Sequence, residues 1–336
     1  MDSIKSALSY PFYYRMLRSS IAFGFIAVIM TSGCGGEDDN DGISNRGILG
    51  DEPGFSNRAV TSVPNEDAIG TKIWVPGLDE GYIPQGLTFA GDQILVGVYQ
   101  SINQNISEGP AKVFRVDPVT GEITGRFDLP SHVGHASGLA YAVDNVLYIA
   151  DSVGLGRTAS GKILKIDLKK AMEEGNCDGA ILGEIILEGL MTPCFLTFDG
   201  VYLWFGTYSV NESDLPVIYK IDPDDVFETW PSVSPVFPDM AFSVFDIDMW
   251  IQGATFDKEG NLWLSQSTGN WGRIQKINPS NGDILEEYEL MAGIEDLAVS
   301  PGGELWSVSE AGAIKYYSWN AYYPLIFQMD VTKLVE

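Results

Sequence analysis

The sequence predicts an all-β fold, and three observations support this prediction. Short runs rich in β-branched and aromatic residues recur along the chain, and turn-forming stretches such as "DPVTG" (117–121) and "NPSNG" (278–282) separate them. Apolar residues alternate with period two or run continuously, and few stretches show the 3.6-residue period of a helix. The runs also repeat in a fixed order, which indicates one supersecondary unit used many times.

The repeated unit contains four predicted strands. The first strands are "QGLTF" (85–89), "SGLAY" (137–141), "CFLTF" (194–198), "QGATF" (252–256) and "EDLAV" (295–299). The second strands are "ILVGVY" (94–99), "VLYIAD" (146–151), "YLWFGTY" (202–208), "LWLSQS" (262–267) and "LWSVSE" (305–310). The third strands are "VFRVD" (113–117), "ILKID" (163–167), "IYKID" (218–222), "IQKIN" (274–278) and "IFQMD" (326–330).

A fourth strand completes the first four units and is missing from the fifth. Those present are "ITGRFDL" (123–129), "ILGEIIL" (181–187), "FSVFDI" (242–247) and "ILEEYEL" (284–290). A similar segment, "TKIWVP" (71–76), stands alone before the first unit. We therefore expect a five-bladed β-propeller over 71–336, closed by this N-terminal strand, because closure leaves only short, protected strand edges. Six blades with one degenerate unit is the alternative. A helical turn is expected at 168–175, and the tryptophans within strands, such as Trp204, Trp263 and Trp306, should pack between blades.

The N-terminal region has the pattern of an export signal. Arg18 precedes an apolar run from Ile21 to Met30, and small residues follow. This run is shorter than the roughly 20 residues that a transmembrane helix needs. Residues 1–33 are thus interpreted as a signal peptide, whose true start could be Met16. "SGC" resembles a bacterial lipobox, which implies that Cys34 is lipidated and anchors the chain to a membrane. The residue after the cysteine is not Asp, and by resemblance to lipoproteins that lack this Asp we expect the outer membrane.

Residues 34–70 are expected to form a disordered acidic tether, because they are rich in polar residues and poor in apolar ones. The net charge of −26 argues against nucleic acid as a partner. The partners expected are the membrane, through the lipid, and a small molecule, a peptide or an envelope protein. Cys177 and Cys194 are predicted to lie on opposite faces of the ring and to remain free, with Cys177 exposed near the rim.

The candidate site is one mouth of the central channel. The start of each first strand and the end of each second strand reach the same face, because antiparallel neighbours return to the same end. Loops on a rigid scaffold commonly carry function. The candidate ligand-binding residues are Gln85, Tyr99, Tyr208, Gln252, Trp271 and Trp319, the last within the aromatic stretch 314–324. That stretch could be a lid or stacking platform, or it could pack over the seam of the ring.

A divalent cation, such as calcium, is a possible cofactor at this mouth. The candidate metal ligands are Asp151, Glu295 and Glu310, and the candidate catalytic residues are His132, His135 and Glu295. In the binding hypothesis, the protein binds its ligand at this mouth and catalyses no reaction. The alternative is a metal-dependent enzyme of the lactone or ester hydrolase type, or a lyase.

Two resemblances bear on this choice. "QGL" at 85–87 with the following "FAGDQILVGVYQ" resembles the first blade of plant- and bacterial-type glutaminyl cyclases, five-bladed propellers that cyclise N-terminal glutamine. That family places a catalytic Glu before the Gly-Leu of the second blade, where this chain has Ser137, so only Gln85 carries over as a substrate-orienting residue. "QGATFDKEGNLWLSQS" is similar to the six-bladed regucalcin and gluconolactonase propellers, which implies calcium near Glu295 and Asp151.

Overall fold

The computed structural model describes residues 45, 47–101, 110–152, 161–189, 192–211 and 216–336. Cys34 and the predicted signal peptide lie outside these residues. Over the described part of the chain, no helix has both the length and the apolar character needed to cross a bilayer.

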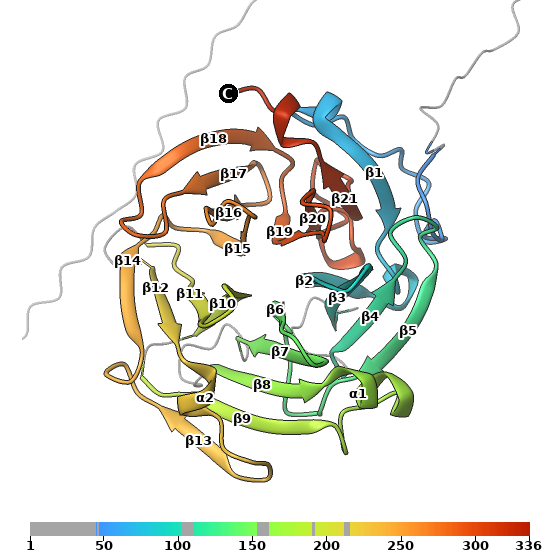
Figure 1. Ribbon diagram of the computed structural model, residues 1–336. Helices are drawn as coiled ribbons and strands as arrows, with labels where there is room; N and C mark the ends of the chain where they lie inside the picture. The colour runs from blue at the N-terminus through green and yellow to red at the C-terminus, as the bar shows by residue number, and fades with distance from the viewer. Residues whose placement is uncertain (1–44, 46, 102–109, 153–160, 190–191, 212–215) are drawn as a thin grey trace, which may run out of the picture. The chain divides into compact units, whose positions relative to one another are not determined.

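Five sheets, each built on four antiparallel strands, surround a central axis, as Figure 1 shows in a view along that axis. Blade 1 contains β2 (Tyr82–Ala90), β3 (Gln93–Gln100), β4 (Lys112–Val116) and β5 (Ile123–Asp128). Blade 2 contains β6 (Gly138–Tyr141), β7 (Val146–Asp151), β8 (Gly161–Asp167) and β9 (Ile181–Leu187). Blade 3 contains β10 (Pro193–Phe198), β11 (Leu203–Thr207), β12 (Val217–Ile221) and β14 (Phe242–Asp246). Blade 4 contains β15 (Ile251–Phe256), β16 (Leu262–Ser267), β17 (Gly272–Ile277) and β18 (Ile284–Leu290).

Blade 5 is shared between the two ends of the described chain. Its strands are β19 (Ile294–Val299), β20 (Leu305–Ser309), β21 (Leu325–Met329) and, outermost, β1 (Ile69–Trp74). Ile73 of β1 pairs with Ile326 of β21 in an antiparallel register. The predicted five-bladed fold and its closure by the N-terminal strand are therefore confirmed, and the described residues contain no sixth blade.

The innermost strands approach one another closely because glycine occupies the second position of the repeated motif in blades 1, 2 and 4. A Cβ atom on Gly138 would lie 2.2 Å from the backbone nitrogen of Leu196 in the next blade. A Cβ atom on Gly253 would lie 2.3 Å from the Cα of Asp296. A larger residue at Gly138 or Gly253 would push neighbouring blades apart.

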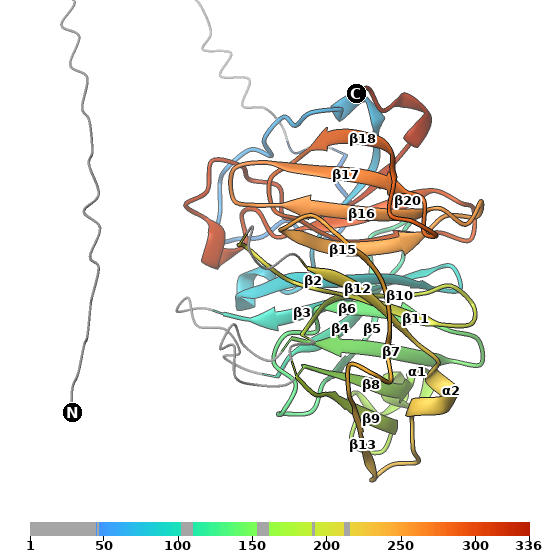
Figure 2. The same ribbon diagram turned by 90° about the vertical axis from the view of Figure 1, so that its left-hand side faces the viewer.

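The core lies between adjacent blades. Trp204, Trp263 and Trp306 are buried there, as predicted. The expected helical turn is α1 (Leu168–Glu174), which begins where the Asp167 side chain accepts a hydrogen bond from the Lys170 amide. Figure 2 shows α1 and the short α2 (Pro223–Val226) at the same end of the channel, the end opposite the starts of the first strands.

Blade 2 has an extra strand that the sequence did not indicate. β13 (Val233–Val236) leaves blade 3 and pairs in parallel with β9, as seen beside β9 in Figure 1. Its Pro235 can occupy an edge strand, where the missing N–H costs no ladder bond. Short 3-10 turns complete the described elements: η1 (Glu66–Ala68), η2 (Leu78–Glu80), η3 (Ile314–Tyr316) and η4 (Val331–Lys333).

The expected tether over 34–70 needs correction where the structure describes it, because residues 47–70 pack on the propeller. Leu49 forms a β-bridge with Ile73, and the ring of Phe55 meets that of Tyr317 edge-on at 5.7 Å. These few apolar side chains, together with the hydrogen bonds of Arg58 described below, offset the entropy of ordering a polar segment.

The two described cysteines are free, as predicted. Cys177 is buried rather than exposed, because the loop after α1 packs against blade 1, where Asn176 forms a β-bridge with Asp128.

Candidate functional site

The first position of the repeated motif forms a ring of polar side chains around one mouth of the channel. Ser137 donates a hydrogen bond to the carbonyl of Pro193 at 2.9 Å, and the Cys194 thiol donates to that of Ile251 at 3.4 Å. Each of these bonds joins one blade to the next. The remaining members of the ring are Gln85, Gln252 and Glu295.

Asp296 occupies the motif position that is glycine in three blades, and its carboxylate fills the space at the axis. Its Oδ2 accepts hydrogen bonds from the amides of Leu87 at 2.9 Å and Leu139 at 3.5 Å. Its Oδ1 accepts from the amides of Ala254 at 3.2 Å and Leu297 at 2.9 Å. Burial raises the pKa of Asp296 well above its usual value, and these four bonds oppose that rise. We call Asp296 the axial carboxylate: it ties together the first strands of four blades.

Glu295 and Glu310 form a buried carboxyl pair beside the axial carboxylate. The two side chains share a hydrogen bond, so one of them carries a proton. Gln85 donates from Nε2 to Oε2 of Glu310 at 3.2 Å, whereas Oε1 of Glu295 has no partner among the described residues. Burial raises the pKa of Glu310 to about 8 and that of Glu295 well above its usual range. A carboxyl group titrating near neutral pH can give or take a proton under physiological conditions.

Two tyrosines and a lysine cover the carboxyl pair. The hydroxyls of Tyr99 and Tyr316 lie 3.3 Å apart, and Tyr316 also hydrogen-bonds Glu310. The Lys315 ammonium donates to the Tyr99 hydroxyl at 3.1 Å and lies 5.3 Å and 5.0 Å from the ring centroids of Tyr99 and Tyr316. These distances are within the range of cation–π attraction. The mouth therefore holds an ammonium group between aromatic faces, above two acids.

Residues 314–319 form the lid that supplies Lys315 and Tyr316. Arg58 of the N-terminal segment holds it by donating to the carbonyls of Tyr317 at 2.7 Å, Trp319 at 3.1 Å and Asn320 at 2.8 Å. Tyr322 and Tyr323 are buried at the seam of the ring. The two roles considered for the aromatic stretch are thus divided between its halves: the first covers the mouth and the second packs over the seam.

The two histidines lie in different surroundings. The His135 ring lies 4.7 Å from that of Tyr99, and its Nδ1 is 2.7 Å from the Ser152 hydroxyl. Burial, with a smaller contribution from the Lys315 charge, lowers the pKa of His135 to about 4, so this imidazole is neutral at pH 7. His132 instead contacts Glu184 of the outer strand β9 at 3.0 Å, toward the rim of blade 2.

Asp151 is directed toward its own loop. Its Oδ1 accepts from the amides of Gly134 at 3.1 Å and His135 at 2.8 Å, and burial raises its pKa. The candidate metal ligands Asp151, Glu295 and Glu310 are thus not assembled around one point. Across the described residues, no three His, Cys, Asp or Glu side chains are grouped as a metal site would require.

The remaining candidate residues divide between the mouth and blade 4. Tyr208 is about a third exposed, and its pKa is raised by burial and by the charge of Glu295, which places it near the carboxyl pair. Gln252 is partly exposed in the ring of first positions. Trp271 stands on blade 4 beside Trp250, away from the pair. The Trp319 ring lies 4.3 Å from that of Tyr316, at an interplanar angle of 36°.

Sequence reasoning named both members of the carboxyl pair but missed the roles of Lys315, Arg58 and the axial carboxylate. One signal for Asp296 was present, since "EDL" breaks the glycine of the motif with an acid. In blades 2 and 4 this position leaves no room even for a Cβ, because the backbone of the next blade is so close. A buried acid at this position must therefore take its hydrogen bonds from neighbouring backbone. Nothing in the local sequence indicates that Arg58 reaches residues 317–320.

The comparisons with known proteins show the fold. No family model matches the chain, and no curated protein matches its sequence. The structure is similar to the glutaminyl cyclase of Myxococcus xanthus, with 13% identity over 80% of this chain and 97% of that chain, at a TM-score of 0.51. It also matches a PQQ-bound aldose sugar dehydrogenase from Streptomyces coelicolor, with 17% identity over 74% of this chain and 94% of that chain, at a TM-score of 0.46. A lactonase-like match, a putative 6-phosphogluconolactonase from Bacteroides uniformis, has 17% identity over 66% of this chain and 62% of that chain, at a TM-score of 0.36.

Proposed function

We propose that the protein binds a small molecule or peptide bearing an amino group at the mouth that contains Glu295 and Glu310. One observation carries this proposal: the Lys315 ammonium already lies between the rings of Tyr99 and Tyr316, close to Glu310. A ligand ammonium would find the same aromatic faces and the same acids after Lys315 swings outward. The lysine is half-buried on a flexible stem, so its displacement needs no change of the blades.

The carboxyl pair would set the pH dependence of this binding. At neutral pH the pair retains a proton, because burial raises the pKa of Glu310 to about 8. An arriving cation favours the ionised form and expels that proton. Affinity should therefore rise with pH up to about pH 8, as long as the ligand amine stays protonated.

The test compares the tripeptide Ala-Phe-Ala with its N-acetylated form by isothermal titration calorimetry. We expect the free amine to bind, Lys315→Met to strengthen binding about tenfold by removing the internal competitor, and Glu310→Gln to weaken it at least tenfold. Lys220→Met is the matched control, since Lys220 also lies over aromatic rings, those of Tyr202 and Trp204, but far from the pair. Equal binding of the acetylated peptide would contradict the proposal.

Acid–base catalysis on such a ligand is the second candidate function. The pKa of about 8 for Glu310 favours it, because a catalytic acid or base works best when it titrates near the working pH. Mass spectrometry of the peptide after prolonged incubation separates the two: an altered mass that Glu310→Gln abolishes indicates an enzyme, and an unchanged peptide indicates a binding protein.

We also propose that the chain is exported and anchored by a lipid on Cys34, most simply to a bacterial outer membrane. The support is the apolar run followed by "SGC" in the sequence. The site would then face ligands or envelope proteins near the membrane, and the net charge of −26 disfavours nucleic acid. Cys34→Ser should move the protein to the soluble fraction and remove the acyl mass, whereas continued membrane association would contradict the anchor.

A further inference from the structure

A hollow lies on blade 4, outside the carboxyl pair and its lid. It has a volume of about 650 Å³ and lies between blade 4, residues 61–64 and residues 320–321. Ligand pockets commonly measure about 300–1,000 Å³. We call it the blade-4 groove. Its most telling lining residues are Trp250, Gln266, Trp271, Arg273, Glu287 and Glu289.

Two tryptophans form the aromatic part of the groove. Their rings meet edge to face at 6.0 Å, and Trp271 is 37% exposed. Trp250 has a φ of 62°, a left-handed conformation that is rare for a bulky residue. Backbone bonds hold it there: its amide donates to Ser209 and its carbonyl accepts from Ser267, both at 3.1 Å. Strained residues held by their surroundings are concentrated at binding sites.

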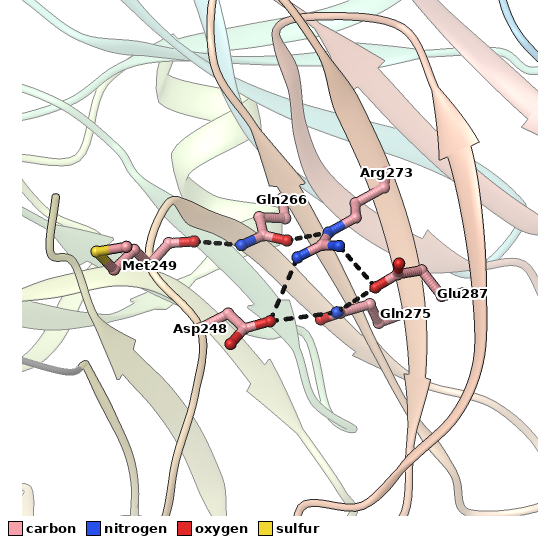
Figure 3. A network of polar contacts seen from close by, with 6 residues as sticks. All are labelled: Asp248, Met249, Gln266, Arg273, Gln275 and Glu287. Carbon is pink, nitrogen blue, oxygen red and sulfur yellow. Dashed lines mark hydrogen bonds and ion pairs between the residues drawn. The ribbon is translucent and has the colours of Figure 1, made fainter. Parts of the chain in front are cut away.

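Arg273, which lines the groove, is at the centre of the network of polar contacts that Figure 3 shows. Its guanidinium contacts Glu287 at 2.9 Å and Asp248 at 3.3 Å, and its Nε donates to the side chain of Gln266. Gln275 donates to Glu287 at 2.7 Å. Arg273 also lies 5.6 Å from the Trp271 ring centroid, so the wall and the indole support each other.

The charge of the wall limits the class of ligand. Asp248 and Glu287 contact the single guanidinium, and the two acids that line the groove itself are Glu287 and Glu289. The wall is thus negative, like the whole protein, and it would repel phosphates and carboxylates. Gln266, Arg273 and Glu287 already partner one another, and the exposed Asn270 and Glu289 offer further polar groups that a purely apolar ligand would leave unused.

We infer that the blade-4 groove binds a neutral carbohydrate. The apolar face of a sugar ring can lie on the exposed indole of Trp271, and amide and carboxylate groups such as those of Asn270, Glu287 and Glu289 can pair with neighbouring hydroxyls. Because Arg273 fixes the wall before a ligand arrives, little side-chain entropy is lost on binding. None of the mouth residues Glu295, Glu310, Tyr99 or Lys315 lines the groove, so this site is independent of the proposed amine site.

The test screens neutral hexasaccharides of glucose, xylose and mannose, with hexagalacturonate as the anionic probe and spermidine as the cationic one. Calorimetry and tryptophan fluorescence report binding. At least one neutral sugar should bind, and Trp271→Ala should weaken it at least tenfold, with Trp271→Phe in between. Phe242→Ala is the matched control, because Phe242 is also an exposed aromatic but lies on blade 3.

Melting curves must first show that each variant is folded. Failure of every neutral sugar to bind the wild-type protein would overturn the inference, as would equal binding by Trp271→Ala and Phe242→Ala. Tighter binding of hexagalacturonate or spermidine at the groove would overturn the assigned ligand class. The peptide experiment above is unaffected by any of these outcomes.

Discussion

Glu295 and Asp296 are neighbours on β19, and both are buried, but their surroundings differ in one decisive respect. The four amide bonds to Asp296 satisfy both of its oxygens. Glu295 shares a proton with Glu310, and its Oε1 has no partner among the described residues. A buried acid whose two oxygens both accept hydrogen bonds acts as part of the framework. A buried acid with an oxygen that has no hydrogen-bond partner is available to a ligand or a proton.

Asp296→Asn should have the largest effect on stability. An amide can accept at only one end, so two of the four backbone donors at the axis lose their acceptor, at about 1–3 kcal/mol each. We expect the free energy of unfolding in urea to fall by about 3–5 kcal/mol. Glu295→Gln is the matched control and should cost little. Similar losses for the two variants would remove the distinction between framework and site.

The pH dependence of stability should come from the carboxyl pair. The pKa of Glu310 is about 8 in the folded protein and 4.5 ordinarily, so the folded chain keeps a proton that the unfolded chain has lost. Stability should therefore fall as pH rises from about 4.5 to 8, by roughly 1.4 kcal/mol per pH unit for this group, and then level off.

Asp296, Glu295 and Asp151 also have raised pKa values and contribute with the same sign. Glu310→Gln should accordingly flatten the slope without abolishing it. Urea unfolding at pH 5, 6, 7 and 8 measures this, and an unchanged slope in the variant would show that the pair is not proton-linked to folding.

The smallest effect is expected around Trp306, where a double substitution tests whether a buried polar group without a hydrogen-bond partner always marks a functional site. Trp263 donates from Nε1 to Asp257 at 3.0 Å, but Nε1 of Trp306, at the same place in blade 5, has no partner within the described structure. Ser300 stands where blade 4 has Asp257, and Glu304 where it has Asn261.

The double substitution Ser300→Asp with Glu304→Asn copies the blade-4 turn. It should raise the free energy of unfolding by about 0.5–1.5 kcal/mol and leave peptide and sugar binding unchanged. The gain should vanish in a Trp306→Phe background. A loss of binding would instead make this unpartnered group functional.

The repeat made the fold predictable. Motifs such as "QGL" and "LW" recur because every blade must bring a first strand to the axis and an aromatic residue to the next blade. Segments that do not belong to the repeated unit were harder to predict. β13 was missed because this lone short segment contains Pro235 and shows no alternation of apolar and polar residues. The packing of 47–70 was missed because its few apolar side chains are scattered along the sequence.

The residues of the mouth could be predicted for a similar reason. Chain direction alone brings Gln85, Glu295, Glu310 and Tyr99 to one mouth, and the structure places them there. Direction does not determine which way a side chain points. His132 and Asp151 come from the correct loops, yet each contacts a partner within its own blade.

The closure of blade 5 has a consequence for how the protein reaches its native state. Residue 73 must meet residue 326, so the last sheet can form only after the four other blades and β21 have been synthesised. Such distant pairing slows folding, because loop-closure entropy is lost before the contact is gained. Until then β1 has no partner strand and blade 5 keeps a free edge, so this is the period in which the chain is most open to aggregation and to chaperones.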